Sequence, residues 1–316
     1  MKKQKMLKKV AIASTAVLLA AAVAVPTGLF IRGNLSRTQL PEGFSSELAD
    51  FDGIQRQEGT DVRIMSANLL VSYKSWGGEP VKPRAKQFTE FVQKTAPDVI
   101  GAQEVCGDWH ACLKANLPNY KIVHPQNNLF QKSLTTLLYN TETLRCVDSG
   151  RMTYSEGDGT KHRAVTWGVF ETLAGGKRFI VTSTHLDLIR EGKEDAEFAI
   201  MRGQAEEFFE LLGDLRAKYD CPAFCTGDYN AMENDSEKGA FAAAGIYDLF
   251  AARLQDTKFR ASLQSAGTEE EWDYPSWDHI FMDGEADILA FRVCSEPFLK
   301  TMSDHYPIFA DIAFKD

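Results

Sequence analysis

Oxygen- and nitrogen-bearing side chains stand where successive apolar runs of this 316-residue sequence begin or end. They are Asn68, Glu104, His185, Asp228 with Asn230, Asp278, and Asp304 with His305. Carboxylate and amide oxygens bind Mg²⁺ or Mn²⁺, and imidazoles transfer protons near neutral pH. A carboxylate can orient an imidazole, and an amide can donate a hydrogen bond to a developing oxyanion. The set therefore predicts a metal-assisted acid–base site.

Each of these side chains also has an ordinary structural explanation when taken alone. A polar strand end such as Asn68 or Glu104 is usually just solvated, and residues 227–230 form a good turn sequence. His185 alone is equally well explained as a hydrogen-bonded residue at a sheet edge. The recurrence of such residues at six strand ends is what favours a functional site.

Short apolar runs bounded by polar turns predict the strands that carry these side chains. The runs are Asp61 to Leu70, Pro97 to Gln103, Leu134 to Tyr139, Ala164 to Phe170, Arg178 to Thr184, Pro222 to Thr226, Trp277 to Met282, Ile288 to Val293 and Tyr306 to Ile312. Helical periodicity runs from Glu194 to Leu215, and a second helix is predicted from Arg84 to Lys94. Strands outnumber helices, which predicts an α/β sandwich of two packed sheets with helices outside. The polar stretch from Gln255 to Pro275 predicts a surface loop.

The N-terminus has the pattern of an export segment. Five lysines fall within residues 1–9, and the 22 residues of 10–31 carry no charge. Ala22-Val23-Ala24 offers a cleavage site, but this length also suffices to span a bilayer. We expect residues 1–33 to be a signal peptide or membrane anchor, residues 34–60 a linker and residues 61–316 one domain. That domain would lie outside the cytoplasm, secreted or held at the membrane.

Composition and charge exclude several classes of protein. With 44% hydrophobic and 25% charged residues, the chain is neither disordered nor collagen-like. Beyond residue 33 it holds 29 basic against 44 acidic side chains, a net charge of −15. Broad nucleic-acid binding is therefore disfavoured unless a metal or a basic patch reverses the field locally. Six cysteines lie in a compartment that permits disulfides, but their spacing selects no pairing.

Taken in order, the polar motifs resemble those of the endonuclease/exonuclease/phosphatase superfamily, the deoxyribonuclease-I-like hydrolases. They are Asn68, Gln103-Glu104, Thr184-His185-Leu186, Gly227-Asp228-Tyr229-Asn230, Asp278-His279-Ile280-Phe281 and Ser303-Asp304-His305-Tyr306-Pro307. The resemblance spans about residues 61–314. It implies a four-layer α/β sandwich of two packed, mostly antiparallel sheets flanked by helices. It also implies metal-dependent hydrolysis of phosphate esters.

The resemblance assigns a metal site to three residues. Glu104 would be the principal ligand of Mg²⁺ or Mn²⁺, with Asn68 beside it and Asp304 near the same ion. Because a metal offsets the charge of a phosphate, so acidic a protein could still bind an anion.

The resemblance also assigns the catalytic groups. His305, held by Asp278, would act as general base or stabilise the transition state. Asp228 would position or activate the attacking water, and Asn230 would donate to a phosphoryl oxygen. His185 would contact the phosphate or protonate the leaving group. One further phosphate contact is assigned to the aromatic residue at a strand end, Tyr139.

Departures from subfamily patterns leave the substrate open. Leu70 stands where abasic-site nucleases carry an acid, and residues 274–279 match the Pro-x-Trp-x-Asp-Arg signature of inositol polyphosphate 5-phosphatases only in part. The interpretation we favour is an exported, monomeric phosphodiesterase or phosphatase, with a lipid or inositol phosphate headgroup among its candidate substrates. An extracellular nuclease is the alternative. A binding protein that kept the fold and lost catalysis is a minor one.

Overall fold

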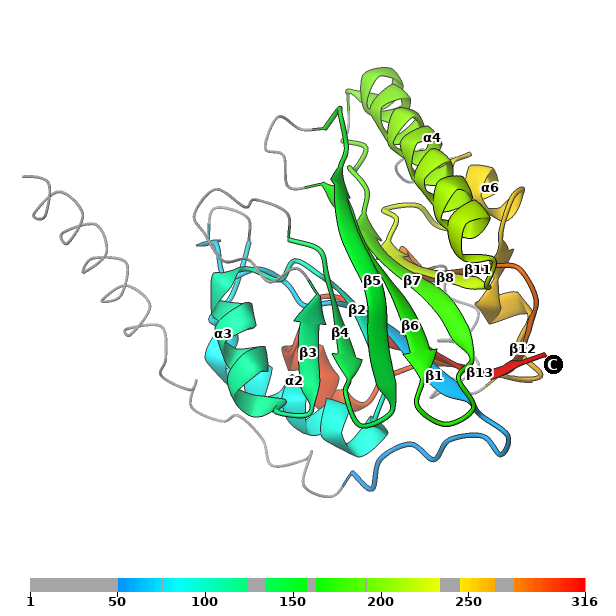
Figure 1. Cartoon of the computed structure of the whole chain (residues 1–316). Helices are drawn as coiled ribbons and strands as arrows, with labels where there is room; N and C mark the ends of the chain where they lie inside the picture. Colours follow the sequence, from blue (N-terminus) through cyan, green and yellow to red (C-terminus); the bar gives the residue numbers. More distant parts are fainter. Residues whose placement is uncertain are drawn as a thin grey trace, which may run out of the picture.

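The computed structural model describes residues 51–74, 77–123, 134–157, 163–190, 192–233, 245–264 and 276–315. Within these ranges the chain forms two β-sheets with helices on their outer faces (Figure 1). The strands are β1 (Val62–Asn68), β2 (Val99–Gln103), β3 (Tyr120–Val123), β4 (Thr136–Asn140), β5 (Leu144–Thr153), β6 (Ala164–Thr172), β7 (Arg178–His185), β8 (Ala223–Asp228), β9 (Gln255–Asp256), β10 (Leu263–Gln264), β11 (Asp278–Asp283), β12 (Ala286–Val293) and β13 (Ile308–Phe314). The α-helices are α2 (Val81–Thr95), α3 (Gly107–Asn116), α4 (Glu194–Tyr219) and α6 (Ile246–Ala251), and two 3-10 helices are η3 (Thr257–Phe259) and η4 (Pro297–Thr301).

The order of the strands brings selected strand ends together. The first sheet has the order β10-β12-β13-β1-β2-β4-β3, and the second has the order β5-β6-β7-β8-β11-β9. Neighbours run antiparallel except in the pairs β1–β2, β10–β12 and β7–β8, so the sheets are mostly antiparallel, as predicted. In the two parallel pairs near the sheet centres, β1–β2 and β7–β8, both carboxyl ends lie at the same edge.

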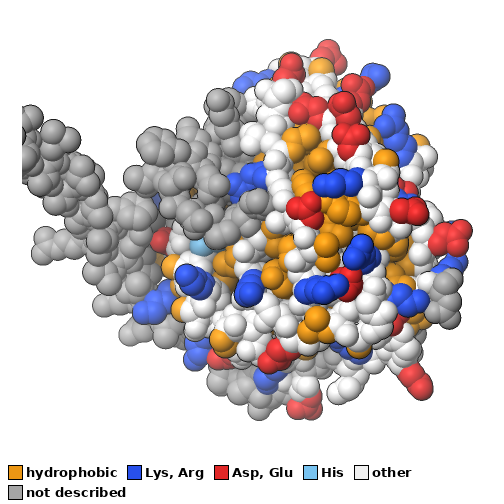
Figure 2. Space-filling model, viewed as in Figure 1, with side chains coloured by type: hydrophobic (Ala, Val, Ile, Leu, Met, Phe, Trp, Pro, Cys, Tyr) orange, Lys and Arg blue, Asp and Glu red, His pale blue; other side chains and the backbone are white. Residues whose placement is uncertain are grey.

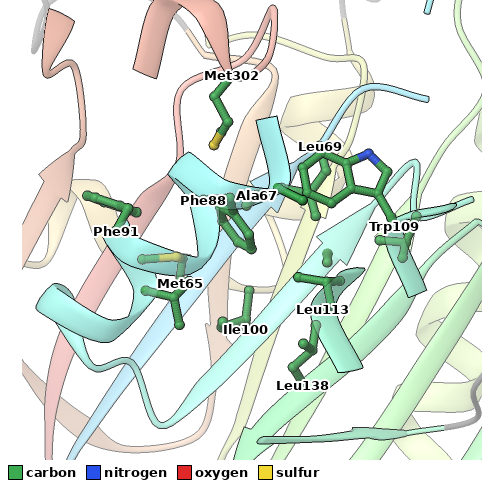
Figure 3. Packing of buried hydrophobic residues seen from close by; sticks show 14 of the residues in the cluster. Met65, Ala67, Leu69, Phe88, Phe91, Ile100, Trp109, Leu113, Leu138 and Met302 are labelled. Atoms are coloured by element: carbon green, nitrogen blue, oxygen red, sulfur yellow. The ribbon is translucent and has the colours of Figure 1, made fainter. Parts of the chain in front are cut away.

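Buried side chains fill three spaces between four layers. One cluster packs the first sheet against α2 and α3, with Phe88 and Trp109 in a T-shaped contact (Figure 3). A second, which includes Phe208 and Phe250, packs the other sheet against α4 and α6. The third lies between the sheets and includes Val99, Phe179 and Phe224. The predicted four-layer α/β sandwich is confirmed.

The two sheets approach closely beneath the strand ends that carry the polar motifs. A Cβ atom at Gly101 would lie 1.7 Å from Oγ1 of Thr226, so only glycine fits between β2 and β8 at this point. Nearby, Gln103 donates from Nε2 to Ser183 Oγ across the interface at 3.1 Å. This contact fixes the end of β2 against the end of β7.

All nine predicted strands and both predicted helices are present. In α4 the buried residues recur at the spacing that the periodicity predicted, from Met201 through Phe208 to Leu215. Among the described residues, four further strands, β3, β5, β9 and β10, and two further α-helices, α3 and α6, were not predicted. Strand β5 lies at the edge of its sheet and is mostly half-buried, so it has no continuous apolar run.

The prediction of a surface loop from Gln255 to Pro275 was wrong for its first part. Asp256, Thr257 and Lys258 are buried, and β9 pairs with β11. Their polar side chains are satisfied by buried partners elsewhere in the chain: Asp256 contacts His279, Thr257 donates to the carbonyl of Ile280, and Lys258 donates to Glu233. A hydrophobicity pattern does not detect such hydrogen bonds. Residues 265–275 lie outside the described residues.

The predicted export segment, residues 1–33, lies outside the described residues, as does most of the predicted linker. Within the described ranges, no helix combines the length and the apolar character needed to cross a membrane. Residues 51–60 pack on the domain, because the buried guanidinium of Arg63 donates to the carbonyls of Ile54 and Gln55. The packed domain thus begins upstream of residue 61. All six cysteines lie in the described part of the chain and are free thiols.

Candidate active site

The predicted polar residues converge because the strands that carry them end at neighbouring points. Asn68 pairs with Gln103 across the parallel strands β1 and β2, which puts Glu104 at the same edge. His185 pairs with Asp228 across the parallel strands β7 and β8. Since β11 runs antiparallel to β8, its first residue, Asp278, also pairs with Asp228.

The carboxylate of Asp228 is the centre of the cluster. Its Oδ2 accepts a hydrogen bond from Asn68 Nδ2 at 2.9 Å and lies 3.2 Å from His185 Nε2. The same oxygen lies 3.9 Å from His305 Nε2, while Oδ1 accepts from the backbone N–H of Asn230 at 2.9 Å. Asp228 therefore joins residues from both sheets into one site.

Charge explains why so buried an acid stays ionised. Burial alone would raise the pKa of Asp228, but the charges of His185 and His305, with hydrogen bonds from His185 and the Asn230 N–H, lower it well below its ordinary value. The site thus contains a permanent carboxylate that orients its neighbours.

His305 forms a tight pair with Asp278, as the family resemblance implies. Its Nδ1 lies 2.5 Å from Asp278 Oδ2. Burial alone would lower the pKa of His305, but the charges of Asp278 and Asp228, the hydrogen bond to Asp278 and the charge of Asp304 raise it to about 10. At neutral pH the ring is therefore an imidazolium whose Nε2 side faces the centre of the site. A fixed cation of this kind can stabilise negative charge on a phosphoryl group.

A second group of oxygen atoms lies beside Asp228, at the end of β1. Glu104 Oε2 accepts from the N–H of Val71 at 2.9 Å, and Oε1 lies 3.4 Å from Asn68 Nδ2. Ser303 Oγ donates to the carbonyl of Asn68 at 2.7 Å. This hydrogen bond attaches the Ser303–Asp304–His305 segment to the end of β1. Glu104 adopts a left-handed backbone conformation, with φ 59°. A non-glycine residue held there is a strained position of the kind that clusters at functional sites.

The donor set of Glu104, Asp304 and Asn68 fits a hard divalent cation. Mg²⁺ is usually held by one or two carboxylates and keeps several waters. Glu104 is half-buried and Asp304 is exposed, so a cation would keep access to solvent. No cluster of three or more His, Cys, Asp and Glu side chains with metal-binding geometry occurs among the described residues. The family resemblance assigns the third ligand to the amide of Asn68.

Arg84 is a site-supporting residue that the sequence analysis missed. Its Nη1 donates to the carbonyls of Leu69 at 2.6 Å and Met302 at 3.0 Å, joining the segment after Asn68 to the segment before Asp304. Burial lowers the pKa of Arg84, while the charges of Cys106, Glu79, Asp304 and Glu104 oppose this. The available signal was a lone arginine on the apolar face of α2, at a position that the helical periodicity assigns to the core.

Two predicted contacts are placed differently from expectation. Tyr139 pairs with Val99 at the start of β2, which lies four residues and thus about 13 Å from the site end of that strand. Its ring packs on Phe170, with ring centroids 5.3 Å apart, so Tyr139 belongs to the inter-sheet core rather than the site. Asn230 lies at the site in a left-handed conformation, but its Nδ2 donates to the carbonyl of Leu186 at 3.0 Å.

The residue after Asp278, His279, lies in a buried polar cluster behind the site. Its Nδ1 lies 3.1 Å from Asp256 Oδ2, and its Nε2 lies 2.9 Å from the carbonyl of Ala231. Burial alone would lower the pKa of His279, but the hydrogen bond and charge of Asp256, with the charge of Glu233, raise it to about 9.

This shift predicts that stability falls as the solution becomes alkaline. The folded pKa lies above the ordinary value of 6.5, so the stabilisation is complete below pH 6.5 and is lost as pH rises through about 9. The difference corresponds to about 3 kcal/mol of unfolding free energy. Urea denaturation at pH 6 and pH 9 measures it. A His279→Gln variant should show a smaller difference between these pH values, and an unchanged difference would contradict the assignment.

Known protein structures share this fold, and a family model matches the sequence of this chain. The family model for the Endonuclease/Exonuclease/phosphatase family matches residues 65–305. A solved family protein from Bacteroides vulgatus superposes with a TM-score of 0.65 at 20% identity, covering 80% of this chain and 99% of the other. The mannosyl-6-phosphatase of Bacteroides thetaiotaomicron gives a TM-score of 0.64 at 20% identity, covering 80% and 100% of the two chains.

A more distant solved structure shares the fold. The catalytic domain of human Nocturnin, solved with a bound sulfate anion, has a TM-score of 0.56 at 17% identity and covers 83% of this chain and 97% of its own. No curated protein matches the sequence. At these identities the structures establish the fold alone, whereas the family model covers more than half of the chain. The matched residues enclose the motifs from the end of β1 to His305, and the chain belongs to the endonuclease/exonuclease/phosphatase family of hydrolases.

Proposed function

We propose that this protein is an exported, monomeric, Mg²⁺-dependent hydrolase of phosphate esters. The observation that carries the proposal is that His305, paired with Asp278, and Asn68, which contacts Glu104, both lie against one buried carboxylate, Asp228. Members of the family generally depend on a divalent metal. A phosphate ester carries negative charge that both a cation and an imidazolium can neutralise.

The metal would be held by Glu104, Asp304 and Asn68, and it would supply charge neutralisation for the phosphoryl oxygens. The chain's own groups then have separable tasks. His305 stabilises charge that develops on the phosphoryl group, and Asp278 keeps its ring oriented. His185 lies against Asp228, and we assign it the donation of a proton to the leaving group.

Asp228 and Asn230 organise the reacting groups from one loop. Asp228 fixes three site side chains through its hydrogen bonds and charge. We assign the same carboxylate the orientation of the water that attacks the phosphorus, which is the role that the family resemblance implies for it. Donation from Asn230 to a phosphoryl oxygen requires its side chain to leave the carbonyl of Leu186.

The substrate class that we propose is a small or membrane-proximal phosphate ester, either a sugar or inositol phosphate or a lipid headgroup. The net charge of −15 beyond residue 33 opposes a long polyanion. On the face shown in Figure 2, acidic side chains gather over α4 and the basic ones are interspersed with hydrophobic side chains. That the fold is shared with a mannosyl-6-phosphatase makes a sugar phosphate a natural first substrate to test.

A panel of substrates tests the proposal with the full-length protein. Mannose 6-phosphate, a soluble phosphoinositide, sphingomyelin vesicles and plasmid DNA are incubated side by side with Mg²⁺, and each reaction is repeated with a chelator. We expect turnover of at least one of the first three substrates that the chelator abolishes. DNA nicking would establish the nuclease alternative, and metal-independent binding without turnover would establish the binding protein.

Export needs a separate measurement, because it rests on residues 1–33. Mass spectrometry of the mature N-terminus distinguishes a chain that begins after Ala24 from one that retains the apolar segment. A cleaved chain should be found outside the cells, and an anchored domain should be degraded when intact cells are treated with protease. Protection of the domain from the protease would contradict export.

Trp277 predicts where the leaving group lies. Its side chain is 46% exposed, and its ring centroid lies 5.8 Å from that of His305. An aromatic face held open beside the reacting groups is a binding surface for a sugar ring or an apolar group. Trp277→Ala is therefore expected to raise KM about tenfold, with a smaller change in kcat. Leu173→Ala, at an exposed position in the β6–β7 turn, is the matched control and should leave KM unchanged.

A further inference from the structure

A buried ionic cluster lies behind the catalytic strand ends, and no step of the proposed reaction uses it. Its four members are Glu233, Asp256, Lys258 and His279, and their exposed fractions are 5%, 7%, 5% and 2%. They come from the loop after β8, from β9, from η3 and from β11. Four charged side chains buried together are costly to desolvate, so stability alone is a poor explanation for them.

The contacts of the cluster join the two segments that carry catalytic residues. His279 bonds to Asp256 on one side and to the carbonyl of Ala231 on the other. Because both partners are acceptors, both ring nitrogens must donate, and the ring is an imidazolium on geometric grounds. Tyr247 donates a further hydrogen bond to Asp256 at 3.2 Å.

The Lys258–Glu233 pair is connected to the backbone of Asp278 through Ser276. Lys258 Nζ lies 2.7 Å from Glu233 Oε1, while Glu233 Oε2 accepts from the N–H of Ser276 at 2.8 Å. Ser276 Oγ in turn accepts from the N–H of Asp278 at 3.1 Å. The chain of contacts thus runs from Lys258 to the residue that holds His305.

Both halves of the cluster bridge the same two segments, residues 228–233 and 276–279. The first segment carries Asp228 and the strained residue Asn230, with φ 47°. The second segment carries Asp278. A loop with a strained residue needs external contacts to stay in one conformation, and His279 and Glu233 supply them from the side away from the reacting groups.

We propose that His279 is a positioning residue, which together with the Glu233–Lys258 pair holds the loop of Asp228 and Asn230 in register with Asp278. If the contacts of His279, Glu233 and Lys258 are removed, the protein still folds, but the distance between Asp228 and the His305–Asp278 pair is no longer fixed. The effect on catalysis rests on the proposed hydrolase function, whereas the effect on the loop does not.

The first test measures the loop without any substrate. The amide of Tyr229 donates to the carbonyl of Trp277 at 2.9 Å, so its hydrogen exchange reports whether the two segments stay together. His279→Phe should accelerate exchange of Tyr229 and Asn230 at least about tenfold relative to the wild type. Leu212→Ala, a buried position on α4, is the control for general destabilisation and should accelerate these amides less. Equal acceleration in the two variants would overturn the proposal.

The second test separates positioning from folding by kinetics. At a temperature where each variant is folded, His279→Phe should lower kcat about 10- to 100-fold with KM within about twofold, because misplaced groups lose rate rather than affinity. His279→Gln keeps one hydrogen-bond donor, so its kcat should lie between those of the wild type and His279→Phe. An unchanged kcat in folded His279→Phe would overturn the proposal.

The third test uses the ion pair and remains informative if His279→Phe does not fold. Lys258→Met leaves Glu233 buried without its cation and should lower kcat. Adding Glu233→Gln removes the unpaired negative charge and keeps an acceptor for the N–H of Ser276. The double variant should therefore recover most of the activity. If the double variant did not recover activity, the proposed role of the Glu233–Lys258 pair would be overturned. Inactivity of the wild type on every substrate would instead refute the proposed function, and hydrogen exchange would still decide the proposal.

Discussion

Replacement of His305 by glutamine is expected to lower kcat by about 10²- to 10⁴-fold, the range that a positioned acid, base or cation contributes. The ring lies between Asp278 and Asp228, so its loss removes the cation that faces the phosphoryl group. Asp278→Asn should have an effect of similar size. It keeps a polar side chain beside the ring but removes the charge that holds the imidazolium.

The two replacements also test whether these residues act as a unit. If Asp278 works only through His305, the double variant should be no slower than the slower single variant. Steady-state kinetics of the three variants, with the folded fraction measured by near-UV circular dichroism, decides this. Additive losses would mean that Asp278 has a second task, and full activity of folded His305→Gln would contradict its assignment.

The positions of the site residues were predictable because they depend on strand ends. Asn68 and Glu104 follow apolar runs, and two runs that pair in parallel necessarily end at the same edge of a sheet. His185 and Asp228 follow the same rule in the second sheet. A sequence pattern identifies such ends well, because buried strands have a strong apolar signal.

The supporting contacts were not predictable for a related reason. Arg84 acts through backbone carbonyls, and a carbonyl leaves no trace in a sequence pattern. Asp256 and Lys258 lie in a stretch whose polar composition predicted a surface loop, yet both are buried and held by tertiary hydrogen bonds. Tyr139 was misplaced because β4 runs antiparallel to β2, and the direction of a strand follows from pairing rather than from its own residues.

Removal of the Glu104 charge is expected to have the second large effect. Glu104→Gln keeps an acceptor for the N–H of Val71 but takes away one of the two carboxylates that would hold the metal. We expect activity at fixed Mg²⁺ to fall by at least about 10²-fold, because the charge neutralisation that a metal supplies is worth several kcal/mol. Raising the Mg²⁺ concentration should restore part of the loss.

Calorimetric titration of Mg²⁺ into the protein without substrate separates metal binding from turnover. Glu104→Gln and Asp304→Asn should both weaken the binding, whereas Glu206→Gln, an exposed acid on α4, should not. Mn²⁺ titrations serve as a second readout, since the same oxygen donors suit both ions. If Glu104→Gln lost activity while its affinity for Mg²⁺ stayed unchanged, Glu104 would not be a metal ligand. Its strained backbone and its contact with Asn68 would then make it an organiser of the Asp228 cluster instead.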